Sequence, residues 1–283
     1  MPLRQLLKET LVKLGGWRAP VFFGGAADVD RWRWVAAHAE PGTVRTLDAG
    51  SGLGALSFHA ANLGNDVVAI SFIPEANRKA RSRAKILGFE NIKFIDGDLR
   101  ALDQMAPSLG QFDQIYCVEV IEHVIRDDKL VRDLAALLKP NGKLLLSTPY
   151  KFHRPISDEK ISEVEDGGHV RFGYTGEELR RLLEANGLEV ISEELITGFV
   201  CQQIDNVFRS LKRWTNRDFA WVVSFPLRIF QVLDEPMSRL TGWPSLSIAM
   251  VAKKRSGAVR SRLRGEEALF LANGGPHRYA RAD

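Results

Sequence analysis

Two carboxylates and an imidazole fall within five consecutive residues of this sequence, Glu119, Glu122 and His123 in the run Glu-Val-Ile-Glu-His. A second imidazole, His169, follows in the run Asp-Gly-Gly-His-Val-Arg-Phe. Carboxylate oxygens and imidazole nitrogens bind Mg²⁺, Mn²⁺ or Zn²⁺, and they also serve as general bases. These four residues therefore predict a divalent-cation site, or metal-free catalysis by His123 or His169 with Glu122 beside them. A structural, hydrogen-bonded role is the third interpretation.

A glycine-rich turn at residues 48–54, Asp-Ala-Gly-Ser-Gly-Leu-Gly, is the second segment with chemical content. An apolar strand is expected before it and a helix over 53–63. Gly50 and Gly52 lack a Cβ where the backbone must turn tightly and approach a ligand. With Asp48 at the end of the strand, the turn indicates a site for a nucleotide-like cofactor. A dinucleotide, or a tight turn without a ligand, remains an alternative.

The surrounding pattern alternates strands with helices. Strands are expected at 44–48, 66–71, 91–95, 112–118 and 143–148, and helices at 53–63, 74–87 and 127–138. A Lys-Pro-Asn-Gly turn at 139–142 precedes the fifth strand. Such alternation predicts a parallel sheet covered on both faces, with ligands at the carboxyl ends of its strands.

Taken together, these motifs resemble class I S-adenosylmethionine (SAM)-dependent methyltransferases, of the methyltransferase type 11 and ubiquinone-biosynthesis O-methyltransferase kind. The segments that carry the resemblance are 48–54, Asp98 after the third strand, Phe112-Asp113, 119–124 and 138–142. The resemblance covers about residues 40–255. It implies an α/β fold: a Rossmann-like sheet of seven strands with helices on both faces. The last strand, expected at 246–253 after one at 190–197, would be antiparallel.

The resemblance also implies a SAM site. The residues that would hold the cofactor are Asp48, Gly50, Ser51, Gly52, Ser71, Asp98, Leu99, Val118 and Glu119. In that site, Asp48 would interact with the amino group of the methionine part of SAM. Asp98 would accept a hydrogen bond from the adenine amino group, and the alternative role for Asp98 is to cap a turn. Ser71 stands where the family usually has an acid for both ribose hydroxyls. We therefore expect a weaker ribose contact, or a contribution from Glu75.

The Glu-x-x-Glu-His pattern with a later histidine is similar to metal-assisted O-methyltransferases, those of ubiquinone biosynthesis and those acting on small-RNA 3′ ends. The same Glu-His pair occurs in relatives with no reported metal. The resemblance thus implies methylation of a small-molecule hydroxyl, with a divalent cation or without one. Methylation of nitrogen or carbon in a lipid, glycan or natural product is an alternative, as is a SAM-binding module without turnover.

Composition limits the remaining possibilities. The 283 residues suit one catalytic domain over 41–254, with a helical cap at 1–40, a helical insertion at 199–243 and a basic tail, expected to be flexible, at 255–283. Two cysteines form no disulfide framework. The sequence shows no signal peptide and no membrane-spanning run, so the expected location is cytoplasmic. The net charge of +4 falls largely in the tail, and no nucleic-acid partner is expected.

The insertion has an unusual composition. Its aromatic segment at 219–230 follows the cations Lys212 and Arg213. Such a segment caps an apolar or lipid-like substrate or contacts a membrane surface peripherally. The simpler alternative is a helical cap packed on the core.

Overall fold

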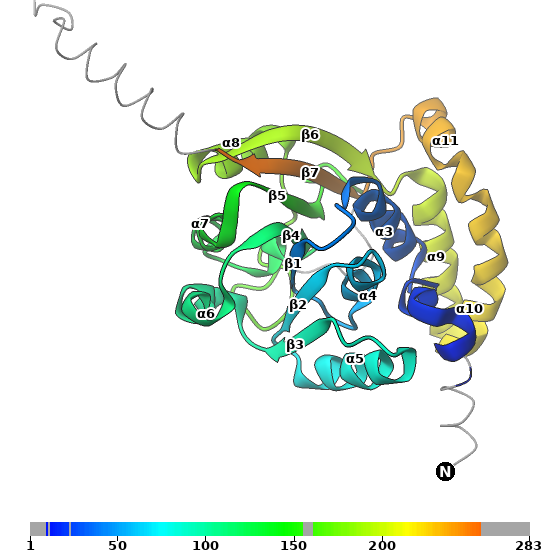
Figure 1. Ribbon diagram of the computed structural model, residues 1–283. Coiled ribbons are helices and arrows are strands. Elements are labelled where there is room, and N and C mark those ends of the chain that lie inside the picture. The colour runs from blue at the N-terminus through cyan, green and yellow to red at the C-terminus, as the bar shows by residue number, and fades with distance from the viewer. Residues whose placement is uncertain (1–9, 11, 23, 155–160, 256–283) are drawn as a thin grey trace, which may run out of the picture.

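The computed structural model describes residues 10, 12–22, 24–154 and 161–255. They form a seven-stranded sheet in the order β3-β2-β1-β4-β5-β7-β6 (Figure 1). The strands are β1 (Arg45–Ala49), β2 (Asp66–Ser71), β3 (Ile92–Asp96), β4 (Phe112–Val118), β5 (Leu138–Pro149), β6 (Leu188–Ile196) and β7 (Ser247–Lys254). The first five strands pair in parallel, and β7 is antiparallel to both β5 and β6. The predicted fold class is confirmed.

Helices cover both faces of the sheet because the strands are apolar on both sides. The first face carries α6 (Leu102–Leu109), α7 (Asp127–Leu137) and α8 (Gly176–Ala185), and the second carries α3 (Ala26–His38), α4 (Ala55–Asn62) and α5 (Pro74–Leu87). Figure 1 shows α6 and α7 on the left of the sheet and α3 and α4 on the right. The turns at the carboxyl ends of the strands are therefore held between two layers of helices.

The fifth strand begins earlier than the sequence pattern predicts. Its segment Leu138–Pro149 includes the expected turn at 139–142, and the pairing with β4 shifts register there. Asn141 takes a left-handed backbone, with φ of 62°, and Lys139 forms an ion pair with Asp113 at 2.8 Å. The turn is therefore present as an irregularity inside a longer strand.

Most of the described chain before β1 is helical. A short 3₁₀ turn (Gly16–Arg18) and α2 (Ala19–Phe22) precede α3. Five leucines near the start of the sequence have helical spacing, Leu3, Leu6, Leu7, Leu11 and Leu14. Leu14 is 79% exposed, and the other four lie outside the described residues. The tail at 256–283 also lies outside them.

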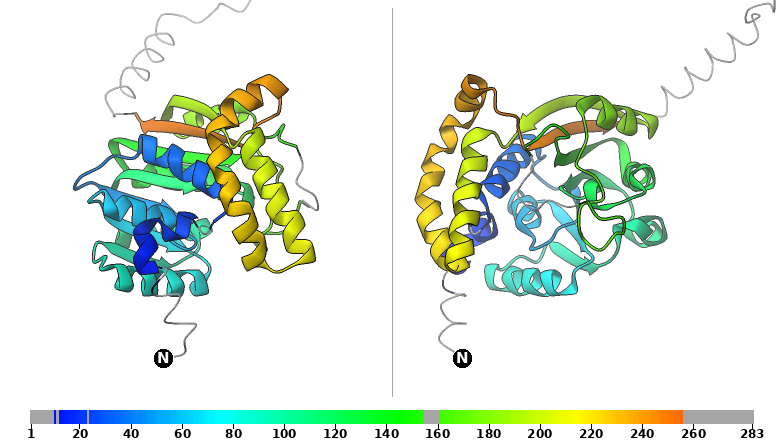
Figure 2. Two further views of the ribbon diagram at one scale, coloured as in Figure 1. Left: turned by 90° about the vertical axis from the view of Figure 1, so that its right-hand side faces the viewer. Right: turned by 180° about the vertical axis from the view of Figure 1, so that it is seen from behind.

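The insertion forms α9 (Phe199–Trp214), followed by α10 (Arg217–Ser224), a 3₁₀ segment η4 (Phe225–Leu233) and α11 (Asp234–Thr241). Phe225 and Asp234, at the two junctions, both have right-handed helical backbones, so the last three segments form one continuous rod. Figure 2 shows this rod, coloured yellow to orange, beside α9 on the outside of the molecule. None of the helices in the described part of the chain is long and apolar enough to cross a membrane.

Half-buried carboxylates join the insertion to α3. Asp205 of α9 accepts hydrogen bonds from the backbone N–H groups of Ala26 and Ala27 at 2.8 and 3.2 Å, which caps the start of α3. In return, Asp30 of α3 accepts from the Thr197 N–H at 2.6 Å, next to the start of α9. Each element therefore satisfies backbone donors of the other, and this fixes their relative position.

Candidate functional site

Two cavities lie at the carboxyl ends of the central strands. The larger has a volume of about 840 Å³ and the smaller about 240 Å³. Gly50 and Glu119 line both of them. The position matches the expectation for a parallel sheet, where the strand order changes direction between β1 and β4.

The glycine turn shapes the boundary between the cavities. Gly50, with φ of 92°, donates its N–H to Ile70 O at 3.0 Å. A Cβ on Gly50 would lie 2.3 Å from Val120 Cγ2, whereas a Cβ on Gly52 would meet nothing within 4 Å. Gly50 is thus required by packing, and Gly52 leaves room for a ligand. The Ser51 hydroxyl, buried in this turn, has no hydrogen-bond partner within the described chain.

Asp48 places a carboxyl group in the wall of the larger cavity. It is 3% exposed and accepts a hydrogen bond from the Ser57 hydroxyl at 2.5 Å. Burial raises the pKa of Asp48 to about 6, and the Ser57 hydrogen bonds oppose that rise. A buried carboxylate with so few partners is suited to receive a cationic group.

The residues expected around the adenosine part of SAM line the smaller cavity, and they include Ser71, Asp98 and Leu99. The Asp98 carboxylate is paired with Arg100 at 2.5 Å, and it caps the 3₁₀ turn η2 (Leu99–Ala101) by accepting from the Arg100 N–H at 2.9 Å. The Arg100 hydrogen bond lowers the pKa of Asp98. The carboxylate is therefore ionised and able to accept a further hydrogen bond.

The two side chains expected near the ribose, Ser71 and Glu75, differ in their surroundings. The Ser71 hydroxyl, at the end of β2, accepts from the Ile73 N–H at 3.3 Å and so keeps its proton available for another acceptor. Glu75 is paired on the surface with Arg78 at 2.7 Å and does not line the smaller cavity. Ser71 is thus the better placed of the two side chains.

Glu119, directly after β4, has a left-handed backbone with φ of 54°. Its carboxylate accepts from Arg31 Nη2 at 2.7 Å and from the Ser147 hydroxyl at 2.9 Å. Arg31 comes from α3, so the helix that contacts the insertion also holds this carboxylate. An uncommon backbone conformation fixed by tertiary contacts is typical of functional sites.

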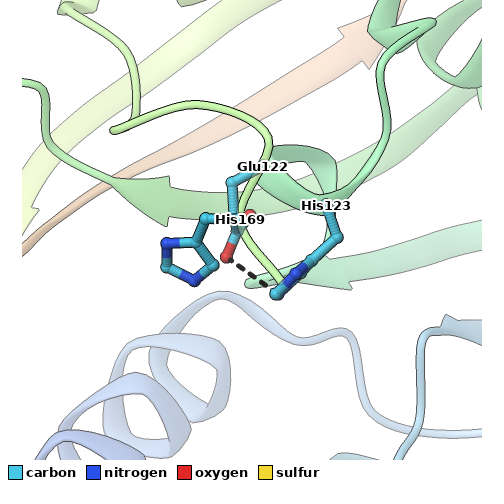
Figure 3. Close-up of side chains that lie close together, drawn as sticks. All are labelled: Glu122, His123 and His169. Atoms are coloured by element: carbon cyan, nitrogen blue, oxygen red, sulfur yellow. Dashed lines mark ion pairs between the residues drawn. The ribbon is translucent and has the colours of Figure 1, made fainter. Parts of the chain in front are cut away.

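Glu122, His123 and His169 converge beyond β4 (Figure 3). Each offers a ligand atom, and these atoms lie within 4.8 Å of one another. Glu122 is fully buried, with Oε2 accepting from the Thr148 hydroxyl at 3.1 Å. Its other oxygen, Oε1, lies 3.8 Å from His123 Nε2 and has no hydrogen-bond partner among the described residues. Burial, followed by the charge of Glu119, raises the pKa of Glu122 well above its usual range.

The backbone fixes which nitrogen of His123 is basic. Nδ1 lies 3.0 Å from the Gly168 carbonyl oxygen, which can only accept a hydrogen bond. In the neutral ring Nδ1 therefore carries the proton, and Nε2, beside Glu122, has the free lone pair. His123 also lines the smaller cavity. The arrangement can accept a proton or bind a cation through Nε2.

Of the four residues predicted as metal ligands, the structure gathers three in this cluster, while Glu119 is directed to Arg31 and Ser147. Sequence reasoning missed Arg31 and Thr148, as well as the carbonyl of Gly168. Arg31 lies 88 positions from Glu119, and no local pattern marks it.

Comparison with known proteins agrees with this geometry. A family model described as a methyltransferase domain matches residues 25–193. The ubiquinone biosynthesis O-methyltransferase of Xanthomonas axonopodis pv. citri is 39% identical over 119 residues, which cover 42% of this chain and 48% of that protein. The corresponding protein of Xanthomonas oryzae pv. oryzae is 38% identical over the same length. The chain thus spans about half the length of the curated relatives it matches.

Among solved structures, a putative sarcosine dimethylglycine methyltransferase from Galdieria sulphuraria aligns with a TM-score of 0.54 and 16% identity, covering 79% of this chain and 84% of that one. The [4+2]-cyclase SpnF aligns equally well, with 18% identity and 80% of both chains covered, so these likenesses show the fold alone. The family model, in contrast, matches more than half of the chain and includes the glycine turn and the 119–123 segment. The chain belongs to this methyltransferase-domain family and has the fold of class I SAM-dependent methyltransferases.

Proposed function

We propose that this methyltransferase acts on a hydroxyl group of a small molecule, and that the Glu122–His123–His169 cluster handles the hydroxyl proton. The observation that carries the proposal is the position of His123, whose basic Nε2 belongs to a buried cluster and which also lines the smaller cavity. An alcohol or phenol is a weak nucleophile until its proton is removed, so a base or a cation beside the acceptor oxygen is required. The partial match to ubiquinone O-methyltransferases supports the same acceptor class.

The described residues fit SAM in two ways. Asp98, Leu99 and Ser71 line the smaller cavity and can contact an adenosine group. Gly52 leaves space for a ligand that lies against the backbone. At the inner end of the larger cavity, the buried Asp48 carboxyl matches an ammonium group. When bound, SAM supplies a methyl group activated by its sulfonium. The protein contributes orientation and exclusion of water.

The cluster can assist in two ways, which share the same atoms. Without a cation, His123 Nε2 accepts the hydroxyl proton while the Glu122 carboxyl lies 3.8 Å away. The resulting imidazolium favours the charged form of Glu122, against the burial that raises the pKa of this carboxyl. With a divalent cation, the three donor residues hold it and the substrate hydroxyl becomes more acidic. The oxygen of Glu122 that lacks a hydrogen bond suits either partner.

Chelation separates the two versions. Transfer of a tritiated methyl group into a panel of hydroxylated metabolites is measured with and without EDTA. If a cation assists, EDTA removes activity, added Mg²⁺, Mn²⁺ or Zn²⁺ restores it, and Glu122→Ala is crippled because a ligand is lost. If His123 is a metal-free base, activity survives EDTA and is lost in His123→Ala. The matched control is His38→Ala, which removes an imidazole of α3 that is paired with Glu194 of β6.

Two outcomes contradict the proposal. A fully active double variant, His123→Ala with His169→Ala, would leave the cluster without a chemical role. Transfer to amines or carbon acids only, with every hydroxylated acceptor inert, would exclude a hydroxyl substrate.

A further inference from the structure

A row of exposed apolar side chains runs the length of the insertion rod. The row, called the outer stripe here, consists of Phe219, Val222, Pro226, Ile229, Leu233, Pro236 and Leu240. Its members are separated alternately by three and four positions, which is the spacing of one side of an α-helix in α10 and α11. All seven are exposed, with Ile229 at 73% and Leu240 at 80%. The outer stripe contains no charged residue.

The outer stripe faces solvent because the other side of the rod is anchored. Ala220, Ser224 and Gln231 are buried there, and Gln231 Nε2 donates to the Ala26 carbonyl oxygen at 3.0 Å. Val223 and Val232, exposed at 41% and 75%, widen the apolar surface on the solvent side. At roughly 1.5 Å per α-helical residue and 2.0 Å per 3₁₀ residue, the outer stripe is about 35 Å long. Large continuous apolar patches are rare on soluble monomeric proteins.

Positive charge gathers at one end of the outer stripe. The segment at 209–217, called the basic turn here, comprises the end of α9, the two connecting residues and the first residue of α10. It contains Arg209, Lys212, Arg213 and Arg217, and the acidic Asp218 follows it. Trp214, in the middle of it, is 88% exposed. Apolar side chains beside cations and an exposed indole match the composition of helices that lie in the headgroup region of a membrane.

We propose that the outer stripe and the basic turn dock this enzyme on the surface of a lipid bilayer that contains anionic headgroups. The apolar side chains enter the boundary between headgroups and acyl chains, and the cations pair with headgroup phosphates. The contact is peripheral, along the length of the rod. This docking proposal does not depend on whether the methyl acceptor is a hydroxyl group.

A second copy of the chain fits the outer stripe less well. A spacing of three and four also occurs in coiled coils, but interlocking of side chains between helices requires regular α-helix. Here the middle of the rod is a 3₁₀ segment of nine residues, and two members of the stripe, Pro226 and Pro236, are prolines. A fluid lipid surface needs no complementary shape. Its anionic headgroups also complement the basic turn.

Docking in this orientation also places the larger cavity near the lipid. Arg217 of the basic turn lines that cavity, which reaches inward to Asp48 and Glu119. The side of the molecule that would touch the membrane is therefore the side on which this cavity has its outer rim.

Vesicle sedimentation tests the proposal with the full-length protein. We expect the protein to sediment with vesicles of phosphatidylcholine mixed with phosphatidylglycerol and to remain in solution with phosphatidylcholine alone, with binding that weakens as salt is added. The double variant Ile229→Ser, Leu240→Ser should bind the mixed vesicles about tenfold more weakly, since two apolar anchors are removed. Lys212→Glu with Arg213→Glu should reduce binding at low salt most strongly.

Matched controls use residues of the same type elsewhere. Ile191 and Leu195, each 52% exposed on β6, are changed to serine, and the exposed Lys85 and Lys93 are changed to glutamate. Circular dichroism confirms that each variant is folded. Both controls should sediment like the unchanged protein.

Three results would overturn the proposal. The first is failure of the folded full-length protein to sediment with the mixed vesicles. The second is equal binding by the Ile229→Ser, Leu240→Ser variant, which would assign lipid binding to another part of the chain. The third is a dimer mass in light scattering that this variant abolishes, without lipid binding, which would make a second copy the occupant.

Discussion

Asp48 is the residue whose protonation most directly concerns cofactor binding. Burial raises its pKa from the ordinary 3.8 to about 6, so in the folded protein without ligand this carboxyl keeps its proton up to about pH 6. The cationic amino group of SAM, in contrast, favours the charged carboxylate of Asp48. Proton release and SAM binding are therefore linked, and the stability of the free protein should fall as pH rises through about 6.

We predict that SAM affinity increases as pH is raised through about 6 and then levels off. Ser57→Ala should move this midpoint to higher pH because the Ser57 hydrogen bonds lower the pKa of Asp48. Asp48→Asn should bind weakly at every pH. Calorimetric titration at a series of pH values measures all three proteins, and a flat profile for the unchanged protein would contradict the assignment of Asp48.

At the scale of elements, the contact between α9 and α3 determines whether the insertion stays in place. Asp205→Ala removes the acceptor for two backbone N–H groups at the start of α3. We expect the free energy of unfolding to fall by about 1 to 2 kcal/mol, the cost of losing a helix cap. Burial raises the pKa of Asp205, so part of the gain from removing a buried charge offsets the lost cap.

Urea unfolding measures this change. Glu184→Ala, at an exposed position on α8, is the control and should change the free energy of unfolding by less than about 0.5 kcal/mol. An unfolding midpoint for Asp205→Ala equal to that of the control would mean that the insertion does not depend on this cap.

The elements themselves follow closely from sequence because their signals are local. Alternation of apolar strands and helices predicts the sheet, and the glycine turn at 48–54 predicts where it binds a ligand. The contacts made across the fold do not follow from such signals. Arg31 reaches Glu119, and the Gly168 carbonyl orients His123, through tertiary packing alone. The outer stripe crosses two helix junctions, so its alternate spacing becomes meaningful only once the rod is known to be continuous.

For the whole molecule, the family assignment gives a direct expectation. SAM and its demethylated product should bind and raise the melting temperature, while NAD should do neither. A ligand present at about 100 times its dissociation constant stabilises the folded state by about 2.7 kcal/mol. Calorimetry and thermal unfolding test this, and tight NAD binding without SAM binding would contradict it. Gly52→Val should remain folded and lose SAM, whereas Gly50→Val also disturbs Val120.

The order of the last strands determines how the sheet can be completed during folding. β6 lies at the edge of the described sheet and pairs there with β7, which follows it in the chain after the whole insertion. Until β7 arrives, β5 has an unpaired edge and β6 has no partner in the sheet. Pairing over such a separation in sequence is slow, because a long loop must close first. The pairing of β7 with β5 and β6 therefore encloses the insertion, and without β7 the insertion would depend on its contacts with α3.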